Sequence, residues 1–191
     1  MKRLGLSALL LLACAFAFGA TDEDGYNEYT IRPVDIPSDA PMFEKFPAEV
    51  FAGSNAAPIL HGDPKTRMFR SRLARWAKER PNFAGHYILA TWGCGTECTQ
   101  ISIIDALTGR IYHPPGVSTN VAVNVHESLL EGGGDLWHAA GAIKFKPDSR
   151  LLILIGMPEE RVENRGVSYY VLENNKLRRI RFVPKAWYPS S

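Results

Sequence analysis

A long series of short β-type segments is the feature that most constrains how this chain folds. From Gly85 onward, segments that alternate apolar with polar residues, or are wholly apolar, are separated by turn residues. Eight strands are predicted, over residues 87–92, 99–105, 110–113 and 121–125, and then over 142–146, 151–155, 167–172 and 177–183. The series predicts a mainly β fold, α+β at the margin, in which two four-stranded antiparallel meanders pack as a sandwich or join into one bent sheet.

Two local patterns refine this prediction. The turn Leu107-Thr108-Gly109 places a glycine where a hairpin loop favours a positive φ. Residues 151–155 are apolar at every position, so this segment is predicted to be a central strand that is buried on both faces. Each meander has about the length of one propeller blade, but two blades cannot close a ring.

One amphipathic helix is predicted over residues 64–79. Asp63-Pro64 is typical of a helix start and Arg80-Pro81 of a helix end, and apolar residues between them recur at helical spacing. The remaining faces carry cations, namely Lys65, Arg67, Arg70, Arg72, Arg75 and Lys78. They could form an anion-binding surface, although a solvated face that also balances nearby acidic residues is the more common meaning of such a pattern.

Residues 21–62 are predicted to form a Pro-rich acidic arm. Five prolines in this stretch block long helices and central strands, and eight acidic residues face only two basic ones, Arg32 and Lys45. We expect an extended segment with a frayed acidic tip that packs through its apolar side chains Phe43, Phe46, Val50 and Phe51. The rest of the chain, residues 63–191, is then a single β-rich domain.

The first twenty residues have the layout of a secretory signal peptide. A positive start at Lys2-Arg3 is followed by an apolar stretch over residues 4–18 and by small residues that end at Ala20. This layout predicts removal of residues 1–20 and export to the periplasm or the cell exterior. A lipobox-like run that ends at Cys14 gives the alternative of a lipid-anchored membrane protein, but the residues after Cys14 stay apolar, which favours plain cleavage.

Charge and hydropathy limit the partners that we expect. The whole chain has 22 basic and 20 acidic residues, and loss of Lys2 and Arg3 with the signal leaves the mature protein formally neutral. A neutral chain lacks the global field that draws proteins to nucleic acid, so no nucleic-acid partner is predicted. The N-terminal apolar stretch is short for a membrane span and no second stretch follows, so no transmembrane span is predicted either.

Cys94 and Cys98 flank a three-residue loop, Gly95-Thr96-Glu97, and are predicted to form a disulfide. Cross-strand neighbours at the base of such a loop bring their α-carbons to ~4.5–5.5 Å, which a disulfide can bridge. The alternative is a thiol-redox or copper-handling site, in which the two thiolates are joined by a histidine such as His86. An oxidising compartment and the absence of a Cys-x-x-Cys pair favour the structural disulfide.

The surrounding motif resembles a group of uncharacterised secreted bacterial proteins. These proteins carry a Gly-His-Tyr run, then Trp-Gly-Cys-Gly-x-x-Cys, then an Asp-x-x-Thr-Gly turn, and the corresponding stretch here covers residues 82–109. The resemblance implies export and a β framework, and it adds nothing about a reaction or a ligand.

Candidate binding residues lie beside glycine-rich turns, where loops carry most binding functions. They are His86, Trp92, Glu97, Trp137 and His138. His86, at a strand entry, fits a hydrogen-bonded structural histidine better than a catalytic base. No catalytic, metal or cofactor motif stands out in the sequence, so no cofactor is predicted.

These observations predict an exported, non-enzymatic binding or inhibitor-type domain. Its expected partner is an unknown protein or small ligand of the periplasm or cell envelope. Thiol-redox or copper chemistry at Cys94 and Cys98 is the first alternative, and a hydrolase whose site assembles only in the fold is the second.

Overall fold

The computed structural model describes residues 26–131 and 138–188. The predicted signal peptide, the lipidation candidate Cys14 and the binding candidate Trp137 lie outside these residues. Within the two described ranges, none of the helices is both long enough and apolar enough to cross a bilayer.

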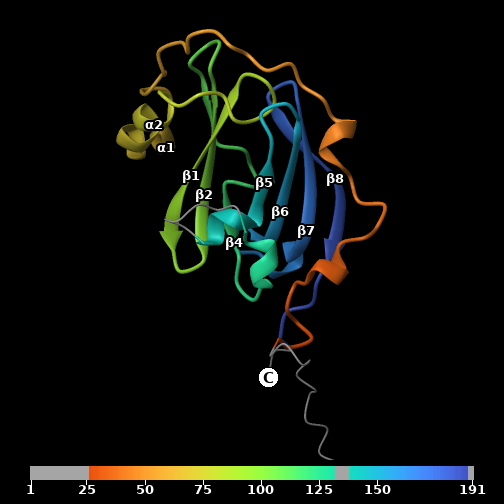
Figure 1. Cartoon of the computed structure of the whole chain (residues 1–191). Coiled ribbons are helices and arrows are strands. Elements are labelled where there is room, and N and C mark those ends of the chain that lie inside the picture. The colour runs from red at the N-terminus through yellow and green to blue at the C-terminus, as the bar shows by residue number, and fades with distance from the viewer. Residues whose placement is uncertain (1–25, 132–137, 189–191) are drawn as a thin grey trace, which may run out of the picture.

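One open antiparallel sheet of eight strands forms the centre of the molecule (Figure 1). The strands are β1 (Tyr87–Gly95), β2 (Cys98–Asp105), β3 (Ile111–Tyr112), β4 (Thr119–Val121), β5 (Ile143–Phe145), β6 (Leu151–Pro158), β7 (Gly166–Glu173) and β8 (Lys176–Pro184). Their order is β1-β2-β4-β6-β7-β8, with β3 paired to β2 and β5 paired to β6. The prediction of a mainly β fold is therefore confirmed, and β4 joins the two sets of strands into one sheet.

The first predicted meander is wrong in its second half. The β4 strand pairs with β2 and with β6 rather than with β3, and it covers residues 119–121 instead of 121–125. The chain leaves the sheet early because Asn124 adopts a positive φ of 54° and hydrogen-bonds to the arm, with its Oδ1 accepting from Thr30 at 2.7 Å. Val125 then makes only an isolated bridge to Ile31.

The inner face of the sheet buries a core that both halves share. Leu89 and Ile103, from β1 and β2, lie in one apolar cluster with Leu152 and Leu154 of β6 and Tyr170 of β7. The sheet curves around this cluster (Figure 1). The prediction that residues 151–155 form a doubly buried central strand is confirmed, since Leu152 and Leu154 face this cluster while their neighbours face the other side.

Two short helices cover the outer face of β1 and β2. They are α1 (Pro64–Met68) and α2 (Arg70–Trp76), so the single helix predicted over 64–79 breaks at Phe69 and ends three residues early. Asp63 caps α1 by accepting the Thr66 N–H at 2.9 Å, as its position before a proline predicts. With the break at Phe69, both Phe69 and Leu73 pack toward β1.

The arm covers the opposite outer face, over β6 to β8 (Figure 1). It contains two 3-10 turns, η1 (Pro33–Asp35) and η2 (Phe43–Lys45), and it packs through Phe43 and Phe46 as predicted. Phe51 packs instead on the helix side, whereas Val50 is 48% exposed, so its predicted packing role is wrong.

Acidic residues of the arm pair with cations in β8, directly after β8 and in the turn after β5. Asp39 lies 2.9 Å from Arg181, Asp35 lies 3.0 Å from Lys185, and Glu44 lies 3.1 Å from Lys146. The arm therefore directs these acidic groups to cations that lie away from the two helices.

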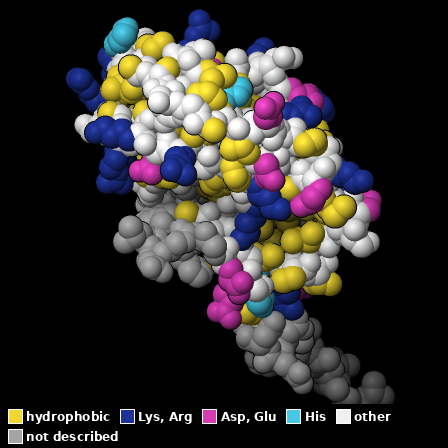
Figure 2. Space-filling model, turned by 45° about the horizontal axis from the view of Figure 1, so that its top comes forward, with side chains coloured by type: hydrophobic (Ala, Val, Ile, Leu, Met, Phe, Trp, Pro, Cys, Tyr) yellow, Lys and Arg dark blue, Asp and Glu magenta, His cyan; other side chains and the backbone are white. Residues whose placement is uncertain are grey.

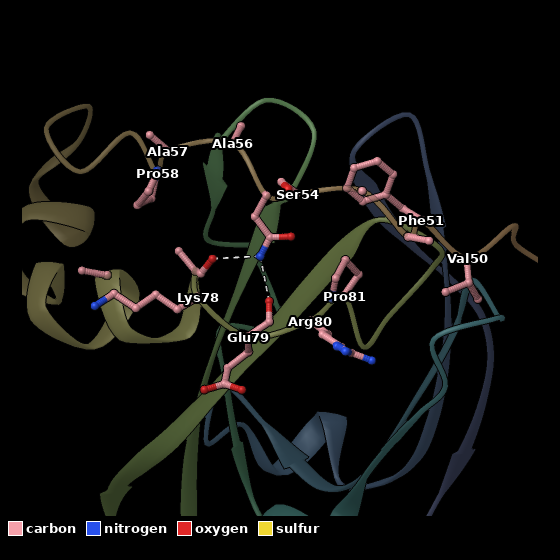
Figure 3. A pocket seen from close by; sticks show the side chains of 15 residues that line it. Val50, Phe51, Ser54, Ala56, Ala57, Pro58, Lys78, Glu79, Arg80 and Pro81 are labelled. Atoms are coloured by element: carbon pink, nitrogen blue, oxygen red, sulfur yellow. Dashed lines mark hydrogen bonds between the residues drawn. The ribbon is translucent and has the colours of Figure 1, made fainter.

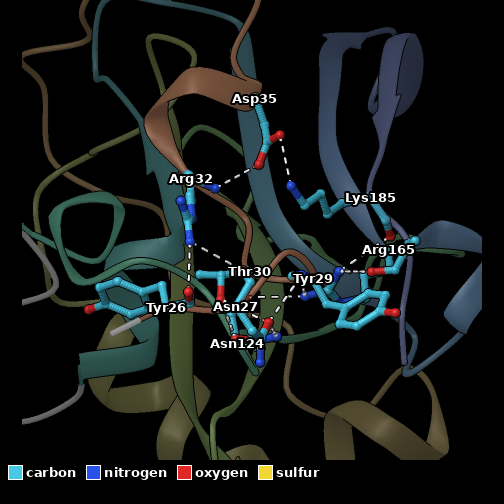
Figure 4. A network of polar contacts seen from close by, with 10 residues as sticks. Tyr26, Asn27, Tyr29, Thr30, Arg32, Asp35, Asn124, Arg165 and Lys185 are labelled. Carbon is cyan, nitrogen blue, oxygen red and sulfur yellow. Dashed lines mark hydrogen bonds and ion pairs between the residues drawn. The ribbon is translucent and has the colours of Figure 1, made fainter. Parts of the chain in front are cut away.

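A buried arginine, Arg165, fixes the start of the arm (Figure 4). The residue is 1% exposed, and its guanidinium donates hydrogen bonds to four backbone carbonyls. The acceptors are Tyr29 O at 2.8 Å, Asn124 O at 3.2 Å, Lys185 O at 3.3 Å and Ala186 O at 2.6 Å. Burial lowers the pKa of Arg165 from its usual value. One side chain thus joins the arm, the segment after β4 and the C-terminal segment.

Candidate functional site

The β1–β2 hairpin carries the Cys94–Cys98 disulfide, which is present as predicted. The two α-carbons are 5.1 Å apart, inside the expected range. The register differs in detail from the prediction, since Cys98 is paired with Gly95 and a register shift between Gly93 and Gly95 places Cys94 in a bulge. Glu97 adopts a positive φ of 54° at the tip, and its carbonyl accepts the Ala122 N–H.

His86 lies at the other end of β1 from the disulfide. Cys94 follows His86 by eight positions along the strand, which corresponds to about 25 Å. The His86 ring lies 4.1 Å from that of Tyr87, and its Nε2 is 3.8 Å from Asp105 Oδ1. The structure therefore does not bring His86 to the cysteines, to Trp92 or to Glu97.

The remaining candidates are also separated. Trp92 is half-buried on the outer face of β1 with its ring 5.0 Å from that of Phe69. His138 begins the 3-10 turn η4 (His138–Ala142), and its side chain is outside the described part. Of the predicted binding residues whose side chains the structure describes, Trp92 is the one that lies beside the helices.

A hydrogen-bonded chain around His113 was not predicted. His113 Nδ1 lies 2.9 Å from Ser102 Oγ, and its Nε2 lies 2.9 Å from Thr66 Oγ1, which donates to Asp63 Oδ2 at 2.5 Å. Desolvation lowers the pKa of His113 despite the opposing effect of Asp63. Because Ser102 and Thr66 are 0% and 1% exposed, neither hydroxyl can meet a substrate. This set of hydrogen bonds joins α1 to β2 and to the residue that follows β3, and its role is structural.

The helices instead present a dense basic face. We use this name for seven cations, Lys65, Arg67, Arg70, Arg72, Arg75, Lys78 and Arg80, all of which except the half-buried Lys65 are exposed. Lys and Arg side chains gather over this edge of the molecule in Figure 2. Among the described residues, no carboxylate forms an ion pair with any of the seven, while the ion pairs of the arm lie elsewhere. The arm therefore does not neutralise the basic face, and Glu79 is the single acidic residue among residues 65–80.

Three hollows follow α2 in series. The largest, about 980 Å³, is lined by residues 50–58, by Ala74 of α2 and by residues 77–81 that follow the helix (Figure 3). Asn55 Nδ2 fixes its wall by donating to the carbonyls of Ala77 at 2.9 Å and Glu79 at 2.7 Å. The second hollow, about 600 Å³, shares residues 79–81 with the first and shares Arg75 and Trp76 with a third of about 450 Å³.

Sequence reasoning identified six of the seven cations of this face, all but Arg80, and did not identify the hollows. The signal in the sequence was the spacing of Arg72, Arg75 and Trp76, which places them on one side of a helix. In the part of the chain that the structure describes, no group of three or more His, Cys, Asp or Glu side chains is placed to hold a metal ion.

Comparison of the chain with models of protein families, with curated proteins and with solved structures found no match in any of the three.

Proposed function

We propose that this chain is an exported, non-enzymatic binding domain that holds an anionic partner in the periplasm or cell envelope. The basic face and the hollows along α2 form its binding surface. The scaffold in this proposal is a bent sheet whose two sets of strands pack on each other and hold the helices in place. The N-terminal layout and the Cys94–Cys98 disulfide support export, since disulfides persist in oxidising compartments.

The observation that carries the proposal is the charge of the basic face, which the arm does not neutralise. Like charges three or four residues apart on a helix destabilise it by about 0.2–0.5 kcal/mol per pair. Arg72 and Arg75 have this spacing within α2, while Arg67 on α1 and Lys78 after α2 add further positive charge at the two ends of that helix. A bound anion would relieve this repulsion, and a concentrated positive field would also attract the anion from solution.

The proposal is tested by binding of the full chain to dextran sulfate at low salt, measured by titration calorimetry. The variant Arg67→Ser/Arg70→Ser/Lys78→Ser removes three exposed cations of the face. Its matched control, Arg161→Ser/Arg178→Ser/Arg179→Ser, removes three exposed cations from the other half of the sheet.

The face variant is expected to bind about tenfold more weakly than the wild type, and the control is expected to bind like the wild type. An exposed ion pair contributes about 0.2–1 kcal/mol, so the loss of three at about 0.5 kcal/mol each gives about 1.5 kcal/mol, which corresponds to about tenfold. Equal binding by the two triple variants would refute the proposal.

A further inference from the structure

The smallest of the three hollows has the lining of a specific site. It lies between α2 and β1, has a volume of about 450 Å³, and is lined by Ser71, Arg72, Arg75, Trp76 and Trp92. Arg72, Arg75 and Trp76 stand at positions i, i+3 and i+4 of α2, so one side of the helix supplies most of the wall. Trp92 of β1 supplies the facing wall.

Nearly every polar group in this lining is a donor. A guanidinium has five N–H groups and no acceptor, and an indole has one N–H and no acceptor. Within the described residues, neither guanidinium and neither indole donates a hydrogen bond to a protein acceptor, and no carboxylate lines the hollow. A group that fills this site must therefore be rich in acceptors and negatively charged.

The two arginines favour a doubly charged group. The Arg72 guanidinium lies 5.9 Å from the centroid of the Trp92 ring, and that ring rests on Phe69, so Arg72 is already oriented. Arg75 adds a second positive charge on the same side of the helix. Arginine binds phosphate oxygens in a bidentate manner, and a dianion placed between two guanidinium groups removes their mutual repulsion.

The volume of this hollow and the groups that line the neighbouring one indicate which class of molecule would carry the phosphate. A volume of about 450 Å³ leaves room for a ring beyond the phosphate, and small-ligand sites fall in this size range. The adjoining hollow, which shares Arg75 and Trp76, adds the Glu79 carboxylate and the Arg80 guanidinium. These groups offer both acceptors and donors to a carrier rich in hydroxyl groups.

We infer that the hollow between α2 and β1 binds a phosphorylated sugar. The phosphate contacts Arg72 and Arg75, the sugar ring lies against Trp76 and Trp92, and the sugar hydroxyls extend toward Glu79. This inference rests on the proposed function, because it assigns a ligand class to one part of the basic face.

The test compares four probes by titration calorimetry and by quenching of tryptophan fluorescence in the full chain. The probes are glucose 1-phosphate, glucose, inorganic phosphate and adenosine monophosphate. Glucose 1-phosphate is expected to bind at least tenfold more tightly than inorganic phosphate, and glucose is expected not to bind. Tighter binding of adenosine monophosphate, or equal binding of inorganic phosphate, would overturn the assignment to a sugar.

Matched variants separate this site from the general charge of the face. Arg72→Gln/Arg75→Gln should lose at least tenfold in affinity for glucose 1-phosphate, whereas Arg67→Gln/Arg70→Gln, with the same change of charge spread over α1 and α2, should keep it. Arg72→Lys, which retains the charge but not the bidentate geometry, should also bind more weakly, and Trp92→Phe should reduce the fluorescence change. If both double Gln variants weaken binding equally, the site is refuted while the proposed function stands.

Discussion

Replacement of the buried Arg165 by methionine should destabilise the protein strongly. Methionine has a similar length and fills the space, but it removes the donor of four backbone carbonyls, of which only Asn124 O keeps a second one within the described residues, the Ile31 N–H at 3.0 Å. The bonds to Ala186 at 2.6 Å and to Tyr29 at 2.8 Å are the short ones, and a hydrogen bond to a charged group contributes about 1.5–3 kcal/mol. Those two bonds alone give a loss of about 3–6 kcal/mol in the free energy of unfolding.

The assay is urea unfolding followed by far-UV circular dichroism, with the free energy taken by linear extrapolation. Arg161→Met is the matched control, because Arg161 is exposed and its ion pair with Glu163 is long, at 3.7 Å. We expect the control to lie within about 0.5 kcal/mol of the wild type. Arg165→Lys keeps the charge but not the fork that reaches Tyr29 and Ala186 together, so it should give an intermediate loss.

A loss below about 1 kcal/mol for Arg165→Met, or a loss equal to that of the control, would refute the reasoning. Such a result would mean that water satisfies the four carbonyls as well as the guanidinium does. The loss should also be accompanied by faster proteolysis near Tyr29, since Arg165 holds the start of the arm.

Three further predictions concern the loops and the buried network. Cys94→Ser/Cys98→Ser should lower the free energy of urea unfolding by only roughly 2 kcal/mol, because the loop that the disulfide closes is short; a loss above about 4 kcal/mol would contradict this. Desolvation lowers the pKa of His113, so its neutral form is favoured in the folded state. The contribution of His113 to the free energy of unfolding should be full above pH 6.5 and should fall as the pH drops toward the pKa of the folded state. An NMR titration midpoint for His113 at or above 6.5 would be inconsistent with its buried contacts. Gly109 and Gly116 both have positive φ, but a Cβ on Gly109 would lie 1.9 Å from Ala57 O, while one on Gly116 meets nothing within 4 Å. Gly109→Ala should therefore destabilise the protein by about 1–3 kcal/mol more than Gly116→Ala in the same unfolding assay. Equal losses would show that the structure around Gly109 relaxes freely.

Local patterns were enough to predict much of the sheet. The segments 87–92, 99–105 and 167–172 lie within β1, β2 and β7, because alternation and turn residues are encoded within each segment. The positive φ of Gly109 and the Cys94–Cys98 disulfide were also predicted from neighbouring residues alone. Each of these features depends on interactions within a few residues of chain.

Features set by distant contacts could not be predicted in the same way. The β4 strand ends at Val121 because Asn124 turns away to meet Thr30, which is far off in the sequence. The ends of the helices likewise follow from packing against β1 rather than from spacing.

The candidate site also combines features that the local sequence predicts with features that only distant contacts determine. The cations of residues 65–80 were visible in the sequence, but a face balanced by the acidic arm was the simpler expectation. Only the fold reveals that Asp35 and Asp39 pair with Lys185 and Arg181, so that the arm does not neutralise the basic face. The hydrogen-bonded chain around His113 gave no signal in the local sequence, because Thr66 and Ser102 contact His113 from separate elements.

The packing of the arm has a consequence for the order in which the protein folds. Ile31 lies in one cluster with Leu151, Tyr169 and Val171, so residues at the start of the arm must wait for strands more than a hundred residues later in the chain. Under the proposed export, the chain folds after it has crossed the membrane, so the delay is set by the formation of these strands. Until then, the acidic residues of 21–62 favour a solvated arm. We expect the arm to dock last and this step to be slow, because contacts between residues so far apart in the sequence raise the contact order of the chain.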